Sequence, residues 1–334
     1  MRPSVRLLVA SVVVALLLAA CSGATSPGQT QSTTSSMSTS TTAGPWSSAI
    51  TLAAGASLSV ISCPTATFCL AASTTGQSYR LVNDQPTTVG KVGLNPSPQG
   101  SAYVSCGSPT FCMAVPNDNQ AVVFNGTAWT APVTIPSAQG FTAVDCVGTS
   151  FCVSIDGEGN SYLYNGARWS GNEGAWGAAN GIACTSPTFC VAAEGGPSIW
   201  NGHVWTQPTD ADAQGQLNAV SCASPTFCIA VDSSGDVLTW NGTAFAPPVA
   251  IATEPPSNGT NASGLTGVSC PTTTFCQAVD SIGRAFSYNG TTWSKGSLIS
   301  THGGLTSVSC PTAMFCAAVD SHGHAYELRE SSKA

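Results

Sequence analysis

Charged side chains are scarce in this sequence. Only 7% of the 334 residues are Asp, Glu, Lys or Arg, against about a quarter in typical soluble domains. The surface must therefore consist mainly of Ser, Thr, Asn, Gln and Gly. With nine basic residues in the whole chain and a net charge of −7, the sequence offers no basic patch for a phosphate backbone, which argues against a nucleic-acid partner.

Hydrophobic runs long enough to cross a membrane are also missing. The main apolar run covers residues 7–20 and follows Arg2 and Arg6. It is shorter than the ~20 residues that a membrane-spanning helix needs. A positive start followed by a short apolar core is typical of an export signal. Residues 1–20 are therefore predicted to form a signal peptide.

The end of this run, Leu18-Ala19-Ala20-Cys21, resembles the lipobox of bacterial lipoprotein precursors. The resemblance implies cleavage before Cys21 and acylation of its thiol. Several acyl chains on one residue are enough for stable anchoring. The protein is thus expected at the cell membrane, on the extracytoplasmic face. An ordinary secretory signal with an unrelated cysteine is the alternative.

The segment after Cys21 contains almost only Ser, Thr, Gly, Gln and Pro as far as residue 44. Such a composition cannot bury enough apolar surface to fold. Residues 21–45 are therefore predicted to be a disordered tether with a root-mean-square reach of about 25–30 Å. Its Thr-rich composition is similar to that of glycosylated stalks, but composition alone leaves glycosylation open.

Fourteen further cysteines form seven pairs, each with five residues between its members. In an exported chain these pairs are expected to be disulfides. Zinc is the rival interpretation, but zinc pairs have shorter spacings and are matched by a second Cys or His pair. The expected pairs are Cys63 with Cys69, Cys106 with Cys112, Cys146 with Cys152, Cys184 with Cys190, Cys222 with Cys228, Cys270 with Cys276, and Cys310 with Cys316.

The pairs mark a repeat with intervals of 38 to 48 residues, a period typical of propeller blades and of helical arrays. The unit at residues 265–293 has short β-prone runs separated by Pro, Gly and Asn-Gly, with no helical period. We predict four strands per unit, at about 266–270, 275–280, 284–288 and 291–299, with the disulfide across the first hairpin. Asn289-Gly290 predicts a tight type I′ turn, in which both residues have positive φ.

Aromatic residues recur at fixed places in these units. Phe precedes the second cysteine in all seven units, and Trp or Phe follows the Asn-Gly position in five. Because both faces of a propeller blade are buried, we interpret these side chains as packing between blades.

The seventh unit ends after its third strand, near residues 325–328, while Trp46 to Leu52 looks like a fourth strand. We therefore predict an all-β fold, a seven-bladed β-propeller over residues 46–330, with the N-terminal strand closing the last blade. The chain would then enter the ring on the face that carries the disulfides, and the tether would hold that face toward the membrane.

These units resemble repeats of exported actinobacterial proteins that are grouped with the sialidase-like (BNR/Asp-box-related) propellers, over nearly all of residues 46–328. The resemblance implies the fold rather than an activity. The Asp-box pattern is poorly matched, because the Gly comes one residue late after Asp232 and Asp280. Sialidases also need three arginines to hold a carboxylate. The body offers only Arg80, Arg168, Arg284 and Arg329, at different repeat positions, so sialidase chemistry is not expected.

Two groups of side chains are candidates for ligand binding on the opposite face of the ring. Four acidic residues recur in the turn after the second strand, where turn formation is favoured over ligand or calcium binding: Asp156, Asp232, Asp280 and Asp320. Three histidines map to the last blade and, with Asp320, could hold a divalent metal, although solvated surface histidines are favoured: His302, His322 and His324. The link at residues 254–264 is a long polar loop on the same face. The sequence assigns no catalytic residue, resident metal or cofactor.

The function predicted first is a monomeric, membrane-anchored binding or scaffold module for a protein, glycan or cell-wall ligand. An envelope glycan hydrolase or lyase on a sialidase-like scaffold is the second hypothesis. A purely structural spacer is the third. No Ser/His/Asp or paired-carboxylate pattern is readable, because a propeller assembles its sites from distant loops.

Overall fold

The computed structural model describes residues 46–92, 102–116, 119–136, 138–171, 173–174, 177–208, 216–253 and 264–330. The chain divides into two units, Met1–Thr41 and Thr42–Ala334, and all described residues belong to the second. The predicted signal peptide, Cys21 and the tether lie outside the described residues. Among the described residues, no helix has the length and apolar character needed to cross a membrane.

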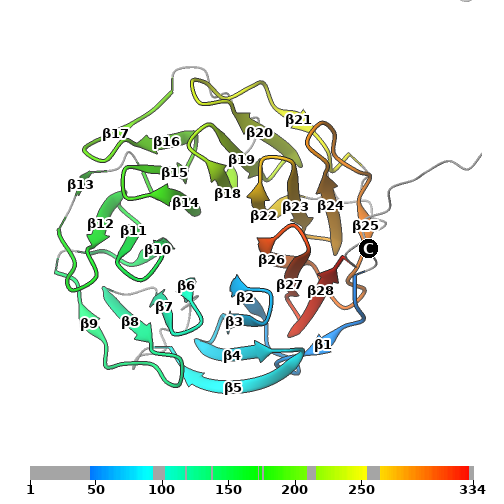
Figure 1. Ribbon diagram of the computed structural model, residues 1–334, viewed down its shortest axis with the longest axis horizontal. Helices are drawn as coiled ribbons and strands as arrows, with labels where there is room; N and C mark the ends of the chain where they lie inside the picture. Colours follow the sequence, from blue (N-terminus) through cyan, green and yellow to red (C-terminus); the bar gives the residue numbers. More distant parts are fainter. Residues whose placement is uncertain are drawn as a thin grey trace, which may run out of the picture. The chain divides into compact units, whose positions relative to one another are not determined.

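The described residues form seven sheets of four antiparallel strands each, arranged around a common centre as the blades of a propeller (Figure 1). The innermost strands carry the first cysteine of each pair: β2 (Leu58–Thr65), β6 (Tyr103–Ser108), β10 (Phe141–Val147), β14 (Gly181–Ser186), β18 (Leu217–Ser224), β22 (Leu265–Thr272) and β26 (Leu305–Thr312). The second strands all begin at the repeated Phe: β3 (Phe68–Ser73), β7 (Phe111–Val115), β11 (Phe151–Asp156), β15 (Phe189–Ala193), β19 (Phe227–Asp232), β23 (Phe275–Asp280) and β27 (Phe315–Asp320).

The third strands run back toward the stapled edge: β4 (Gln77–Val82), β8 (Gln120–Phe124), β12 (Asn160–Tyr164), β16 (Pro197–Trp200), β20 (Asp236–Trp240), β24 (Arg284–Tyr288) and β28 (His324–Arg329). The outermost strands are β5 (Gln85–Lys91), β9 (Val133–Thr134), β13 (Glu173–Gly174), β17 (Trp205–Thr206), β21 (Val249–Ala250), β25 (Ser297–Leu298) and β1 (Ile50–Thr51). Six of these seven have only two residues, shorter than predicted, whereas β5 has seven.

This topology defines two faces. One face carries the turns from the first to the second strand and from the third to the fourth strand of each blade, and we call it the bottom face. The top face carries the turns between second and third strands and the links between blades. Blades are numbered 1 to 7 from β2–β5 to the blade of β26, β27, β28 and β1.

The predicted closure of the ring by the N-terminal strand is confirmed. β1 pairs with β28 through Ile50↔Ala325 and Thr51↔His324. Nearer the bottom face, Trp46 is bridged to Leu328. Leu328 in turn pairs with Cys316 of β27, so Trp46 lies level with a disulfide. The chain therefore joins the ring at the edge that carries the disulfides, as the sequence predicted.

The seven predicted disulfides are confirmed, each between the first and second strands of its blade. Their Cα–Cα distances are 3.9–4.1 Å. In four blades the two cysteines are direct partners in the strand register, and in blades 1, 6 and 7 they lie at a register shift. All seven disulfides lie toward the bottom face. In blade order they join Cys63 to Cys69, Cys106 to Cys112, Cys146 to Cys152, Cys184 to Cys190, Cys222 to Cys228, Cys270 to Cys276, and Cys310 to Cys316, at the 3.9–4.1 Å given above.

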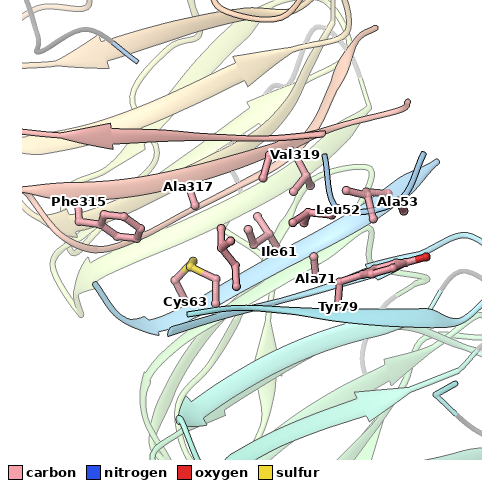
Figure 2. Close-up of a cluster of buried hydrophobic side chains, with 13 residues drawn as sticks. Leu52, Ala53, Ile61, Cys63, Ala71, Tyr79, Phe315, Ala317 and Val319 are labelled. Carbon is pink, nitrogen blue, oxygen red and sulfur yellow. A yellow bond between two sulfur atoms is a disulfide. The ribbon is translucent and has the colours of Figure 1, made fainter. Parts of the chain in front are cut away.

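The apolar core lies between neighbouring blades. Figure 2 shows one such layer, in which Phe315, Ala317 and Val319 of β27 face Ile61 and Cys63 of β2 across the junction of blades 7 and 1. All five are at most 5% exposed. The repeated phenylalanines also reach across blades.

At the junction of blades 1 and 2, for example, Phe68 stacks on Phe124 with ring centroids 6.2 Å apart. The Trp or Phe after the Asn-Gly position packs on the end of the third strand of its own blade, as Trp293 does on Tyr288. These side chains also contact the preceding blade, where the Trp129 Nε1 atom donates to Ser78 Oγ at 2.9 Å. The interpretation of the aromatics as packing between blades is thus confirmed.

The predicted type I′ turns at Asn-Gly are wrong. In each of the five pairs only the glycine has positive φ. The pairs instead open a four-residue loop, as between the bridged Tyr288 and Trp293. There the Asn289 Oδ1 atom accepts hydrogen bonds from the backbone N–H groups of residues 291 and 292. A two-residue turn with both φ angles positive occurs where β4 meets β5, at Asn83 (φ 49°) and Asp84 (φ 64°).

A ring of polar contacts joins the innermost strands. In six blades the residue before the first cysteine accepts a hydrogen bond, at 2.7–3.0 Å, from the backbone N–H of the first cysteine of the next blade; these acceptors are Ser62, Ser105, Asp145, Ser221, Ser269 and Ser309. Blade 4 has Ala183 at this position. The Asn180 Nδ2 atom of blade 4 donates to the Leu217 carbonyl of blade 5 at 2.7 Å, as Asn218 of blade 5 does to Leu265 of blade 6. We call the six hydrogen bonds from the cysteine N–H groups the interblade clasps.

Asp145 is the acidic member of the clasps. Its carboxylate accepts from the Ser105 hydroxyl at 2.9 Å and from the Cys184 N–H at 2.7 Å. Desolvation raises the pKa of Asp145 to about 6, and these hydrogen bonds oppose the rise. In the sequence, the clasps are marked by a Ser or Asp directly before the first cysteine of six units. This pattern was not recognised from the sequence.

Candidate functional site

The four predicted turn carboxylates occupy equivalent places on the top face. Each ends the second strand of its blade and is fully buried. In every case one carboxylate oxygen accepts from the backbone N–H groups two and four residues later, at 2.8–3.1 Å, which holds the turn into the third strand. The third residue after each Asp is a glycine with positive φ, a conformation that a side chain would strain. The turn-forming role favoured from the sequence is what the geometry shows.

The residue four positions after each carboxylate differs between the blades. In blade 3 the Asn160 amide donates to Asp156 at 3.1 Å. In blade 6 the Arg284 Nε atom donates to Asp280 at 2.7 Å. In blade 7 the His324 Nδ1 atom lies 3.1 Å from Asp320 Oδ2. One turn geometry therefore presents different chemistry in different blades.

Blade 5 places a second carboxylate, Asp236, beside its turn carboxylate, Asp232. Desolvation raises the pKa of Asp236, and the charge of Asp232 adds to the rise. The turn of blade 3 also contains a second carboxylate, the exposed Glu158.

Three blades lack the turn Asp and have Ser73, Pro116 or Glu194 at that position. Glu194, in blade 4, is only 4% exposed. Burial raises its pKa to about 7, although hydrogen bonding lowers it in part. Within the described residues, its Oε1 atom has no hydrogen-bond partner. Sequence reasoning missed this residue because it followed the Asp and not its position in the repeat.

The three predicted histidines are brought to the top of blade 7. His302 lies on the link between β25 and β26, whereas His322 and His324 flank the turn after β27. The rings of His302 and His324 lie side by side, with centroids 4.3 Å apart and planes tilted by 38°. The His322 Nδ1 atom lies 3.1 Å from the hydroxyl of the neighbouring Ser321. Of the predicted loop at 254–264, residues 254–263 lie outside the described residues.

The four arginines of the body do not converge. Arg284 belongs to a top-face turn, and Arg80 is in the middle of β4, paired with Leu70. At the bottom edge, Arg329 forms ion pairs with Glu327 and with Asp84 of blade 1. Arg168 lies in the bottom-face loop of blade 3. These four side chains are therefore not placed to hold one carboxylate together.

Comparison with known proteins found no matching family and no curated protein similar in sequence. Solved structures do match. The structure of YCF48 bound to D1 peptide is 14% identical, with a TM-score of 0.67 over 87% of this chain and 97% of that chain. YCF48 from Cyanidioschyzon merolae is 13% identical, with a TM-score of 0.63 over 85% and 98%. The WD40 repeats of RRP9 are 10% identical, with a TM-score of 0.71 over 84% and 97%. At such identities the likeness concerns architecture alone: the chain has a seven-bladed β-propeller fold shared with YCF48 and WD40-repeat proteins.

Proposed function

We propose that this protein is a lipid-anchored extracytoplasmic module that binds a protein partner through its top face. The observation that carries the proposal is the contrast within the repeat. The turn carboxylate is held in the same way in four blades, while the side chain beside it is Asn160, Asp236, Arg284 or His324. Varied side chains on loops of a rigid scaffold are the usual basis of recognition. No enzymatic activity is proposed.

The anchor rests on the lipobox at Cys21 and on the point where the chain joins the ring. Trp46 lies at the stapled edge, so a tether that ends there leaves the top face accessible from outside the cell. The bottom face carries the same disulfide in all seven blades and the same Asn-held loop in five, and thus offers little basis for selectivity.

A protein partner is favoured over a glycan for two reasons. A propeller of similar architecture, YCF48, has been solved bound to a D1 peptide. The top-face turns also combine anionic, cationic and neutral hydrogen-bonding groups, which suits a mixed polypeptide surface. A glycan or cell-wall ligand is a distinct outcome of the test below.

The anchor is tested by metabolic labelling with an alkyne analogue of palmitate. We expect the wild-type chain to be labelled and to fractionate with membranes. The Cys21→Ser variant should be unlabelled. Equal labelling of the two chains would overturn lipid attachment at Cys21.

The top-face site is tested by photo-crosslinking in intact cells, with the full chain. A photoreactive amino acid replaces Ser234 in the top turn of blade 5 or, as the matched control, Thr243 in the bottom loop of the same blade; both residues are exposed. We expect a protein adduct from position 234 that an excess of unmodified chain suppresses, and none from position 243. Adducts only at position 243, or at neither position, would contradict the proposal, and a carbohydrate adduct at position 234 would replace the protein partner with a glycan.

A further inference from the structure

Blade 7 brings three metal-ligating side chains together on the top face. One ligand-type atom from each of His302, Asp320 and His324 lies within 4.8 Å of the others. His302 is exposed and His324 is partly exposed, whereas Asp320 is fully buried beneath them. The group thus has a rigid acidic base and two imidazoles at the surface.

The hydrogen bonds fix the tautomer of His324. Asp320 Oδ1 accepts from the backbone N–H groups of His322 and His324, both at 2.9 Å. Oδ2 lies 3.1 Å from His324 Nδ1. A carboxylate with so many donors is ionised and only accepts hydrogen bonds, so Nδ1 carries the proton. In the neutral ring the lone pair is then on Nε2, the atom that binds a metal when a carboxylate holds the other nitrogen.

The same reasoning applies to His302. Its Nδ1 atom lies 3.4 Å from the Tyr326 phenol oxygen. The single proton of that phenol is directed to Asp320 Oδ2 or to the Ser300 hydroxyl, at 2.9 and 3.0 Å. Toward His302 the phenol oxygen can therefore only accept. His302 Nδ1 is the donor, and the lone pair of its neutral ring is also on Nε2.

We propose that the Nε2 atoms of His302 and His324 bind one divalent transition-metal ion of the borderline class, such as Zn²⁺ or Cu²⁺. Imidazole suits these ions, and water completes the coordination. Zn–N bonds are about 2.0–2.1 Å long, so the two nitrogens must lie closer together than the ring centroids do. Metal binding therefore requires the exposed His302 side chain to rotate, which releases its Nδ1 contact with Tyr326. Asp320 orients His324 and contributes negative charge from behind; it is not itself a ligand, because its oxygens are already occupied.

Blade 6 supplies a variant that removes a ligand while keeping the turn. Its Arg284 occupies the position of His324 and pairs with Asp280 as His324 pairs with Asp320. His324→Arg should therefore reproduce a native pair of this same fold and abolish the Nε2 ligand. The site differs from the proposed protein-binding function and can exist without it.

The test is calorimetric titration of the full chain with ZnCl₂, in a Cys21→Ser background so that no thiol competes. We expect one Zn²⁺ per chain and at least a tenfold loss of affinity in both His302→Ala and His324→Arg. Two matched controls, His203→Ala in the exposed bottom loop of blade 4 and His322→Ala, should stay within twofold. Absence of zinc binding by the parent chain, or equal affinity in the His324→Arg variant, would overturn the site.

Two further measurements separate a lost ligand from a lost fold. Zn²⁺ should raise the melting temperature of the parent chain, reversibly with EDTA, but not that of a folded His324→Arg chain. Cu²⁺ bound to the parent should show coupling to two imidazole nitrogens by electron paramagnetic resonance, and coupling to one in His302→Ala. A two-nitrogen signal that persists in His302→Ala would exclude His302 as a ligand.

Discussion

On the bottom face all seven blades repeat the same disulfide, whereas on the top face equivalent positions differ from blade to blade. The bottom carries a staple in every blade and clasps at six of the seven junctions, with Ala183 at the seventh. The top carries a turn Asp in four blades and Ser73, Pro116 or Glu194 in the others. The repeated stabilising contacts thus lie at one edge of each blade, and the side chains on which the proposed recognition depends lie at the opposite edge.

The largest expected effect comes from reducing the disulfides of the bottom face. Each closes a loop of only about seven residues, for which chain entropy gives about 2 kcal/mol. Seven together amount to roughly 10–15 kcal/mol, as much as the whole stability of an ordinary domain. We expect dithiothreitol to unfold the body at ambient temperature, as measured by circular dichroism. A reduced chain that keeps a cooperative melt would show that the core alone sustains the fold.

The next effect concerns Glu194, a top-face residue that is buried without a full set of partners. Its folded pKa of about 7 lies above the ordinary value of 4.5. The stability that this group contributes is therefore fully present below pH 4.5 and is lost as the pH rises through 7. At pH 8 we expect Glu194→Gln to be more stable than wild type by roughly 2–3 kcal/mol, with no such gain at pH 4. Urea unfolding of both chains at the two pH values checks this. An equal difference in unfolding free energy at pH 4 and pH 8 would refute a cost of burying the ionised Glu194.

A smaller effect should follow from removal of one clasp. Ser221→Ala deprives the Cys270 N–H of its acceptor and should cost about 1–2 kcal/mol. Ala183→Ser, which adds the missing acceptor in blade 4, should gain up to about 1 kcal/mol. Ser48→Ala, at an exposed side chain, is the control and should change the free energy of unfolding by less than about 0.5 kcal/mol. A loss of the same size in the control would deny the clasps a role.

The smallest effect is expected where two carboxylates meet in blade 5. Asp236→Asn removes the repulsion from Asp232 and should stabilise the chain by a few tenths of a kcal/mol at pH 7. At pH 3, where the raised pKa of Asp236 leaves this group protonated in the wild-type chain, the gain should vanish. Thermal melts in low and high salt test whether the gain in stability is electrostatic, since screening by salt should reduce an electrostatic gain.

The sequence was sufficient to predict the fold because its signals were local and repeated. The Cys spacing determined the hairpins, and a third strand without a fourth indicated closure by residues near Trp46. The Asn-Gly turns were mispredicted, because the pair favours a two-residue turn in isolation. In the structure the Asn289 side chain satisfies the N–H groups of a longer loop.

The site was predicted less completely. The turn Asp residues and the blade 7 histidines were found from the repeat, but the tautomers of His302 and His324 depend on Tyr326 and Ser300. These residues come from the link before β26 and from β28, which only the folded blade 7 brings together. Glu194 was missed because the repeated Asp was followed and not its position in the repeat, and the burial of Glu194 is in any case a property of the packed blade and not of its own segment.

The pairing of β1 with β28 has a consequence for the order of assembly. Each staple joins cysteines six positions apart, so a blade hairpin can be oxidised soon after it is made. The contact of Ser47 with Glu327 spans 280 positions. At about 10 residues per second of synthesis, the first strand waits on the order of half a minute for its partner. We therefore expect the strand nearest the N-terminus to be the last to be placed, after the other strands of the ring.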